Sequence, residues 1–206
     1  MAVIVVANPK GGVGKSTLAT NVAGLLARQG RAVMLGDTDR LQTARQWLAL
    51  RPAAAARIRG WEQTDHHYVV RPPLGTTDAV LDTPAGMPDS QLDAVLRIAD
   101  KLLVPLQPSL FDIQATDAFL RTLRAHPRVQ GIALALVGMR VREHTLANGQ
   151  LHRYAASLAV PVIAWLRDTQ NYVQLAARGL TLWDLSPGRV ERDLEQWQPL
   201  KEWILR

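Results

Sequence analysis

Residues 8–17 of this 206-residue chain read Asn-Pro-Lys-Gly-Gly-Val-Gly-Lys-Ser-Thr, and this run decides the fold. Residues 2–7 before it form an unbroken apolar run rich in β-branched side chains, which is typical of a central strand covered on both faces. Residues 16–28 after it place apolar side chains at helical spacing, and Gly30 is positioned to end the helix. The sequence therefore predicts a strand, a glycine-rich loop and a helix in direct succession.

The glycine-rich loop has the composition of a phosphate site. Gly11, Gly12 and Gly14 permit positive φ angles and a close approach of backbone N–H groups to an anion, and the following helix adds its dipole. Lys15 is expected on the β- and γ-phosphates of a nucleotide, and the Ser16 hydroxyl on Mg²⁺. The run thus predicts a nucleoside triphosphate with Mg²⁺ as cofactors.

The rest of the chain alternates predicted strands and helices. Strands are expected at residues 32–36, 79–81, 102–106, 132–137 and 160–165, and helices at 43–50, 92–98, 113–123, 172–178 and 190–205. This alternation predicts an α/β fold of the P-loop NTPase kind, with a mostly parallel, twisted β-sheet and helices on both faces. We expect residues 1–206 to form a single domain, because the chain is short for two.

Residues 51–75 interrupt this alternation. An alanine run, prolines and the pair His66-His67 indicate an irregular surface excursion with at most one edge strand. The two histidines could bind a metal ion, but neighbouring side chains point apart, and no cysteine or clear carboxylate cluster accompanies them. A solvated loop is the favoured interpretation.

Composition excludes several classes of protein. The chain contains no cysteine, which rules out disulfides, cysteine nucleophiles and iron–sulfur ligation. Its first residues are too few for a membrane span and lack the charged start of a signal peptide, so we expect a cytoplasmic protein. The net charge is +6, and a basic surface attracts polyanions such as nucleic acid or an anionic membrane. A coding bias would explain the preference for arginine over lysine, but not this net excess.

The phosphate loop resembles that of a known family. Residues 10–17 are similar to the deviant Walker A motif of the ParA/MinD ATPases, Lys-Gly-Gly-x-Gly-Lys-Ser/Thr. The resemblance implies ATP hydrolysis, with nucleotide contacts from Lys10, Gly11, Gly12, Val13, Gly14, Lys15, Ser16 and Thr17. In the family the first lysine reaches the ATP of a partner subunit. Lys10 is therefore expected to act in trans across an ATP-dependent homodimer, in the manner of an arginine finger.

Two acidic segments support the resemblance. Residues 33–39 look like the family's second strand and switch I, which implies that Asp37 supports Mg²⁺ and Asp39 orients the attacking water. The family usually continues with Pro-Gln, whereas Arg-Leu follows Asp39 here. Residues 80–86 look like the Walker B and switch II segment, which implies that Asp82 holds Mg²⁺ through water; a turn or cap residue is the alternative. The implied catalytic residues are Lys10, Lys15 and Asp39, and the implied metal ligands are Ser16, Asp37 and Asp82.

Recognition of the base departs from the family pattern. Family members often carry Asn-Arg after the strand expected at residues 132–137, where they read the adenine. Met139 and Arg140 stand there in this chain, so Arg140 is the candidate contact to the base. Residues 103–109 and 165–168 look like later strands of the family, so the resemblance covers nearly the whole chain.

The family includes proteins with different functions, and the sequence excludes some of these subfamilies. A nitrogenase-reductase relative needs cysteine ligands, which this chain lacks. An anion-pump or tail-anchor relative would carry an extra helical insertion, for which only residues 51–75 are available. The first strand begins at residue 2, so we expect no helix-turn-helix before it. The chain looks like the small ParA-type partition ATPases, of which ParF is an example.

Partition ATPases of this type bind non-specific DNA as the ATP dimer, and an adaptor, ParB-like or other, stimulates hydrolysis. The candidate DNA contacts are Arg121, Arg124, Arg128, Arg140, Arg142, Arg153, Arg178, Arg189 and Arg192. Phosphate contacts of this kind weaken steeply with salt. The hypothesis is a nucleoid-associated ATPase of the cytoplasm that partitions a plasmid, a chromosome or another cargo.

A membrane-associated positioning ATPase like MinD is the alternative. Its sequence basis is an apolar stripe at helical spacing, formed by Val190, Leu194, Trp197, Leu200 and Ile204. Acidic residues beside the stripe and a proline within the helix oppose contact with anionic lipid. Packing of the stripe on the protein's own core is the favoured interpretation.

Overall fold

The computed structural model describes residues 1–62, 71–143, 145–158 and 160–206. His66 and His67 lie outside the described residues, so the loop favoured for them stays a prediction. The expected edge strand is present within residues 51–75 as β3 (Ile58–Trp61).

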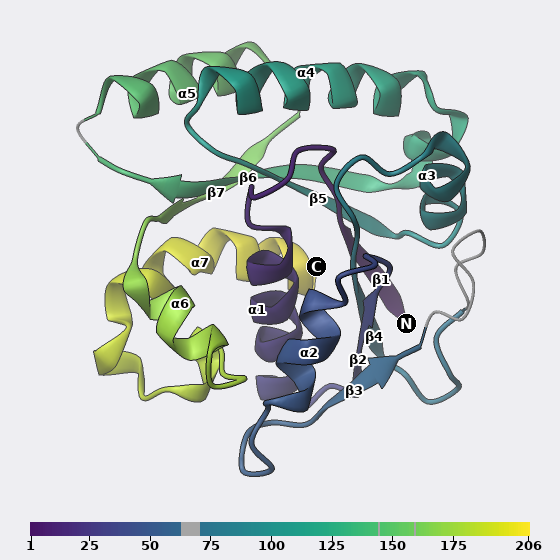
Figure 1. The fold of residues 1–206 in the computed structure, drawn as a ribbon, viewed down its shortest axis with the longest axis vertical. Helices are drawn as coiled ribbons and strands as arrows, with labels where there is room; N and C mark the ends of the chain where they lie inside the picture. Colours follow the sequence, from purple (N-terminus) through teal and green to yellow (C-terminus); the bar gives the residue numbers. More distant parts are fainter. Residues whose placement is uncertain (63–70, 144, 159) are drawn as a thin grey trace.

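A seven-stranded sheet organises the chain, and all its neighbouring strands run parallel (Figure 1). Its other strands are β1 (Ala2–Val6), β2 (Val33–Asp37), β4 (Asp78–Asp82), β5 (Lys101–Leu106), β6 (Ala133–Val141) and β7 (Val162–Arg167). Their order across the sheet is β3-β2-β4-β1-β5-β6-β7. The predicted α/β fold with a parallel sheet is confirmed.

Helices cover both faces of the sheet, as Figure 1 shows. One face carries α1 (Lys15–Arg28), α2 (Thr43–Ala49), α6 (Gln170–Ala176) and α7 (Glu191–Leu205). The other carries α3 (Asp89–Leu96), α4 (Leu110–Ala125) and α5 (Leu146–Ser157). Short 3₁₀ turns lie at Pro127–Gly131, Leu182–Asp184 and Pro187–Arg189.

The apolar run of β1 supplies both cores. Ile4 and Val6 pack with the α1 side, whereas Val3 and Val5 pack with the α4 side, because successive side chains of a strand point to opposite faces. All four are buried. This is why the strand needs no polar alternation, and why it sits at the centre of the sheet with β4 and β5 on either side.

The helix α5 was not predicted from the sequence. Only Leu151 is buried among its twelve residues, so its apolar periodicity is weak. The local signal that marks it is its cap, because the hydroxyl of Thr145 accepts a hydrogen bond from the backbone N–H of Asn148 at 3.2 Å.

The apolar stripe of α7 packs inside the protein. Val190, Trp197, Leu200 and Ile204 are buried in the core on the α1 side, and Leu194 is half-buried against it. The core-packing interpretation is confirmed, so the stripe does not present a membrane-binding face. Among the described residues, no helix combines the length and the apolar character needed to cross a bilayer.

Lys101, at the start of β5, fastens the end of α7. Its Nζ donates to the carbonyl oxygens of Trp203 and Ile204, both at 2.8 Å, and lies 5.1 Å from the centre of the Trp203 ring. The last carbonyls of a helix have no partner within the helix, and a cation there is favourable.

We expect Lys101→Met to lower the free energy of unfolding by about 1–3 kcal/mol, because two carbonyls lose their donor. Urea unfolding followed by circular dichroism measures it. Lys201→Met, a change in α7 that removes no hydrogen bond among the described residues, is the control and should stay within about 0.5 kcal/mol of the parent. Equal losses in the two variants would show that Lys101 does not fasten α7.

Candidate nucleotide-binding site

The loop between β1 and α1 lies at the carboxyl edge of the sheet, where parallel α/β sheets bind ligands. Gly12 and Gly14 have φ angles of 77° and 97°, and Gly14 caps the start of α1. A Cβ on Gly14 would lie only 2.9 Å from the methyl carbon of Met139. The expectation of positive φ is wrong for Gly11, where a Cβ would make only an ordinary contact of 3.8 Å with Ala85.

Asn8 anchors the loop to the rest of the fold. Its side chain is 2% exposed, and its Oδ1 accepts the backbone N–H of Lys10 at 2.9 Å. Its Nδ2 donates to the carbonyl oxygen of Pro105 at 2.8 Å and to the hydroxyl of Thr116 at 3.0 Å. Gln107 adds a second anchor, since its Nε2 donates to the carbonyl oxygen of Gly12 at 2.8 Å. These hydrogen bonds fix the backbone of the loop.

The two lysines of the loop have opposite environments. Lys15 is 8% exposed, and its Nζ donates to the carbonyl oxygen of Lys10 at 2.9 Å. Burial lowers the pKa of Lys15, while the charges of Asp82 and Asp39 act to raise it. The Lys10 side chain is exposed and makes no hydrogen bond or ion pair to the described residues. The Lys15 side chain is thus buried within the phosphate loop of its own chain, whereas the Lys10 side chain is exposed to solvent.

Asp82 ends β4 beside the start of α1. It is 1% exposed, and burial raises its pKa to about 7, against the hydrogen bond of the Ser16 hydroxyl and the charge of Lys15. Its Oδ1 is buried and accepts no hydrogen bond from the described residues. A buried carboxylate oxygen without a partner is costly, and a divalent cation or its water would satisfy it.

Asp37 ends β2 and holds the start of α2. Its carboxylate accepts backbone N–H groups from Asp39 at 2.9 Å, Ala44 at 2.8 Å and Arg45 at 3.4 Å. Burial raises the pKa of Asp37, and these three hydrogen bonds act to lower it. Asp39 is half-buried, and its Oδ1 accepts the N–H of Leu41 at 3.0 Å. The predicted acids therefore lie together with Lys15 and Ser16 at one edge of the sheet.

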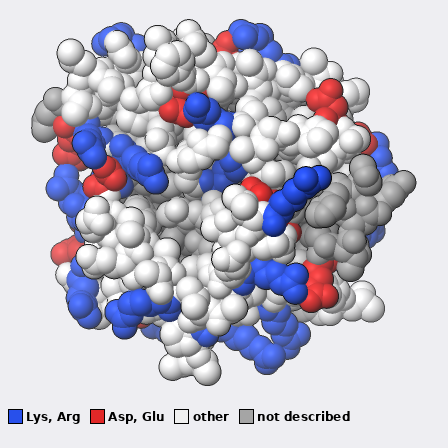
Figure 2. Space-filling model, viewed as in Figure 1, with Lys and Arg blue, Asp and Glu red and all other residues white. Residues whose placement is uncertain are grey.

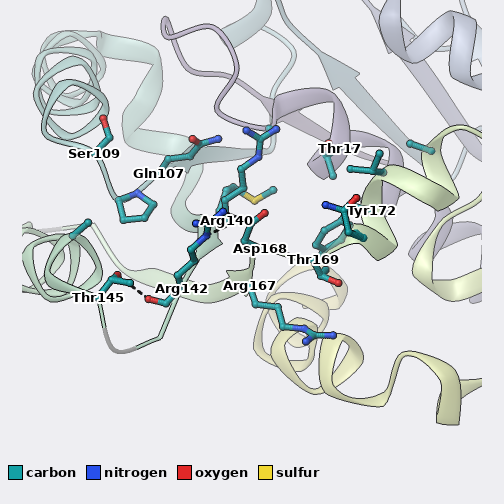
Figure 3. A pocket seen from close by; sticks show the side chains of 17 residues that line it. Thr17, Gln107, Ser109, Arg140, Arg142, Thr145, Arg167, Asp168, Thr169 and Tyr172 are labelled. Carbon is teal, nitrogen blue, oxygen red and sulfur yellow. Dashed lines mark hydrogen bonds and ion pairs between the residues drawn. The ribbon is translucent and has the colours of Figure 1, made fainter.

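A cavity of about 820 Å³ opens beside the loop (Figure 3), within the range that small-molecule ligands occupy. Its lining includes Gly14, Thr17, Gln107, Pro108, Ser109, Met139, Arg140, Arg142, Asp168, Thr169, Tyr172 and Val173. The cavity starts at the phosphate loop and runs toward the ends of β6 and β7. Its position suits the nucleoside part of a nucleotide whose phosphates lie on the loop.

Comparison with known proteins decides the family. Residues 4–182 match the family described as the CobQ/CobB/MinD/ParA nucleotide binding domain. The chain belongs to this family. It is a ParA/MinD-type ATPase that binds ATP, and members of the family dimerise and work with partner proteins.

Individual relatives agree with this assignment. "Maintenance of carboxysome distribution protein A" of Gloeobacter kilaueensis is 29% identical over 184 residues, which cover 87% of this chain and 83% of the relative. Apo McdA from Cyanothece superposes with a TM-score of 0.76 at 16% identity, over 100% of both chains. MinD of Aquifex aeolicus gives 0.74 at 19% identity, over 100% of this chain and 97% of that one. At these identities the solved structures show the common fold alone.

The residues at the end of the cavity expected to bind the adenine base could only partly be predicted from the sequence. Arg140, the predicted base contact, lines the cavity, and its φ of 51° falls in the left-handed region where β6 and β7 lose their regular register. Such an irregularity turns side chains out of the strand pattern. Figure 3 shows Arg142 and Asp168 at the same end of the cavity, joined by hydrogen bonds of 2.6 and 2.9 Å. No local signal in the sequence marks this pair, because Arg142 follows β6 and Asp168 follows β7.

Proposed function

We propose that this ATPase is an ATP-switched positioning protein: it dimerises on MgATP, binds non-specific DNA as the dimer, and releases it when an adaptor stimulates hydrolysis. The observation that carries the proposal is the contrast between its two loop lysines. Lys15 is buried within its own loop, while the side chain of Lys10 is exposed and forms no hydrogen bond or ion pair with the described residues of its own chain. A second copy of the chain gives the Lys10 charge a role at a partner's phosphates.

We propose that the ATP is bound together with Mg²⁺. The Oδ1 of Asp82, which accepts no hydrogen bond from the described residues, and the hydroxyl of Ser16 are hard oxygen groups that would hold the ion directly or through water. Asp37 remains a proposed supporting acid. Among the described residues no group of three or more His, Cys, Asp or Glu side chains is arranged to hold a metal ion alone. We propose that phosphate oxygens of the nucleotide complete its ligands, and that the ion, when bound, would neutralise the charge that develops on the phosphoryl group.

Exposed apolar side chains around the site support dimerisation there. Leu41 follows β2, Leu110 and Phe111 begin α4, Leu146 begins α5, and Val173 lies in α6 on the cavity wall. Each is more than half exposed. All belong to segments that leave the carboxyl edge of the sheet, the edge that carries the phosphate loop. Apolar residues gathered around a functional site favour association with another surface.

The cargo is proposed from the relatives. One relative is named for carboxysome distribution, and one structure of the same fold is a plasmid partition protein of Borrelia burgdorferi with AMPPNP. We propose that this ATPase distributes a plasmid, a chromosome or a protein cargo over the nucleoid, in the cytoplasm, through a ParB-like or other adaptor.

The nine arginines proposed as DNA contacts differ in their bonding to acids. Four of the nine arginines bond to acids, in the pairs Arg121–Asp117, Arg128–Asp93, Arg142–Asp168 and Arg192–Glu143. Arg140 lines the nucleotide cavity. The remaining four of the nine candidates are exposed and bond to no acid among the described residues: Arg124, Arg153, Arg178 and Arg189. Figure 2 shows basic side chains spread over the face around a central hollow.

Arg178 and Arg189 are the contacts we propose to respond to nucleotide. Arg178 follows α6, whose Tyr172 and Val173 line the cavity. A nucleotide in the cavity would therefore contact the helix that precedes Arg178. We expect Arg178→Ala with Arg189→Ala to weaken ATP-dependent DNA binding about tenfold and to reduce the salt slope by about 2. Co-sedimentation with plasmid DNA at several salt concentrations, with ATP and with ADP, measures both.

The matched control removes the same charge from the far edge of the sheet. Arg57 and Arg59, beside and within β3, are exposed and have no acid partner among the described residues, and their double alanine variant should bind DNA nearly as the parent does. Equal weakening in both double variants would refute the contact we propose. Binding to anionic liposomes with ATP, without any binding to DNA, would favour the membrane alternative and overturn the proposed function.

A further inference from the structure

Gln42, in the turn between β2 and α2, has an unusual backbone conformation. Its φ and ψ are 50° and 39°, in the left-handed region. Among the described residues only Gln42 and Arg140 take positive φ without being glycine. Side chains with a Cβ disfavour this region, so a glutamine there needs compensating contacts.

The hydrogen bonds that Gln42 donates all go to the two switch aspartates. The side-chain Nε2 of Gln42 donates to the carbonyl oxygen of Asp37 at 3.0 Å and to that of Asp39 at 2.7 Å. Its backbone N–H donates to the carbonyl oxygen of Asp39 as well, at 3.0 Å. The amide thus spans the short segment that carries both acids.

The bonds between this turn and α2 are reciprocal. The carboxylate of Asp37 accepts the N–H of Ala44 in the first turn of α2, and the side chain of Gln42, directly before that helix, donates one hydrogen bond to the carbonyl oxygen of Asp37. Loss of either side chain opens one half of this ring. The strained turn and the switch segment therefore hold each other in place.

We propose that Gln42 is a positioning residue for ATP hydrolysis, whose amide fixes the backbone of Asp39 and thereby the direction of its carboxylate. The inference rests on the proposed role of Asp39 in orienting water. Asp39 is only half-buried, and the hydrogen bond recorded for its carboxylate comes from Leu41 in the same turn. The orientation of the Asp39 carboxylate thus depends on how firmly the turn is held. Small displacements of a catalytic group lower reaction rates strongly.

Gln42 lies outside the cavity that suits the nucleoside. It does not line the cavity beside the phosphate loop, and its hydrogen bonds go to the switch segment and to the start of α2. A change at Gln42 is therefore expected to affect the turnover number and to leave the affinity for ATP in place.

Gln42→Gly removes the side-chain amide without adding backbone strain, because glycine accepts a φ of 50° without cost. We expect kcat to fall about tenfold while KM for ATP stays within about twofold. The melting temperature should remain close to that of the parent. Gln42→Glu, which places carboxylate oxygens against two carbonyl oxygens, should lower kcat further.

Two further variants make the test decisive. Gln46→Ala is the matched control, because its Nε2 donates to the carbonyl oxygen of Leu41 in the same turn but to neither aspartate, and its kcat should stay near the parent value. Asp39→Ala should lose turnover on its own. A parental kcat in Gln42→Gly, or an equal loss in Gln46→Ala, would overturn the role of Gln42. Normal turnover in Asp39→Ala would instead refute the role of Asp39 and this inference with it.

Discussion

Lys15→Ala is expected to weaken ATP binding at least about 100-fold, which corresponds to about 2.7 kcal/mol. The Lys15 ammonium lies inside the phosphate loop, 2.9 Å from the carbonyl oxygen of Lys10, and is 8% exposed. The nearby charges of Asp82 and Asp39 act on it from the same site. Without the ammonium, the triphosphate loses this cation, and only the proposed Mg²⁺ would oppose the charges of the two acids. Isothermal titration calorimetry with MgATP measures the affinity.

Lys201→Ala is the control for Lys15→Ala. Lys201 is a half-buried lysine of α7, in the helix that packs on β7, and does not line the nucleotide cavity. Its replacement should leave the affinity for ATP unchanged. Binding of ATP by Lys15→Ala within about tenfold of the parent affinity would contradict the placement of the triphosphate on this loop.

Lys10→Ala is expected to keep ATP binding within about threefold and to lower turnover at least about 100-fold, since a positive charge supplied in trans to a phosphoryl group is worth 10³–10⁵ in kcat. The physical reason is the exposure of the Lys10 side chain, whose own loop is held by the backbone bond to Asn8 and by the anchors of Asn8. The loop should therefore survive the change. Steady-state release of phosphate, together with ATP titration, separates the two effects.

A charge-conserving variant sharpens the test at Lys10. Lys10→Arg keeps a cation that reaches phosphate oxygens, so it should recover part of the turnover that Lys10→Ala loses. Parental turnover in Lys10→Ala would refute a catalytic role for this lysine. A large loss of ATP binding in Lys10→Ala would place Lys10 in its own site instead of a partner's.

The parts of the fold that could be predicted are those with a local signal. The apolar run of β1, the glycines at 12 and 14 and the acids at 37 and 82 each stand in a recognisable stretch, and the structure brings them to one edge of the sheet. The parts that could not be predicted depend on contacts between distant segments. Asn8 bonds to β5 and to α4, and Arg142 bonds to Asp168 after β7, so neither partner is visible in the neighbouring sequence.

Gln42 shows the same limit within a short stretch. The sequence reveals that Arg-Leu replaces the family's Pro-Gln after Asp39, but not that the next residue takes a left-handed conformation and turns its amide back onto two carbonyls. Backbone strain at a polar residue becomes visible only when its compensating bonds are known. The sequence also could not tell which arginines are paired with acids, because several of these pairs join distant segments of the chain.

The most direct test of the central claim is the molar mass of the protein with nucleotide, measured by light scattering after gel filtration. We use Asp39→Ala, which should bind MgATP without hydrolysing it. We expect a mass of about 45 kDa with MgATP, twice the 22.7 kDa of the monomer, and 22.7 kDa with MgADP. Adding Lys10→Ala should return the MgATP form to 22.7 kDa. An Asp39→Ala protein that stays monomeric while saturated with MgATP, or a dimer that persists without Lys10, would contradict the account.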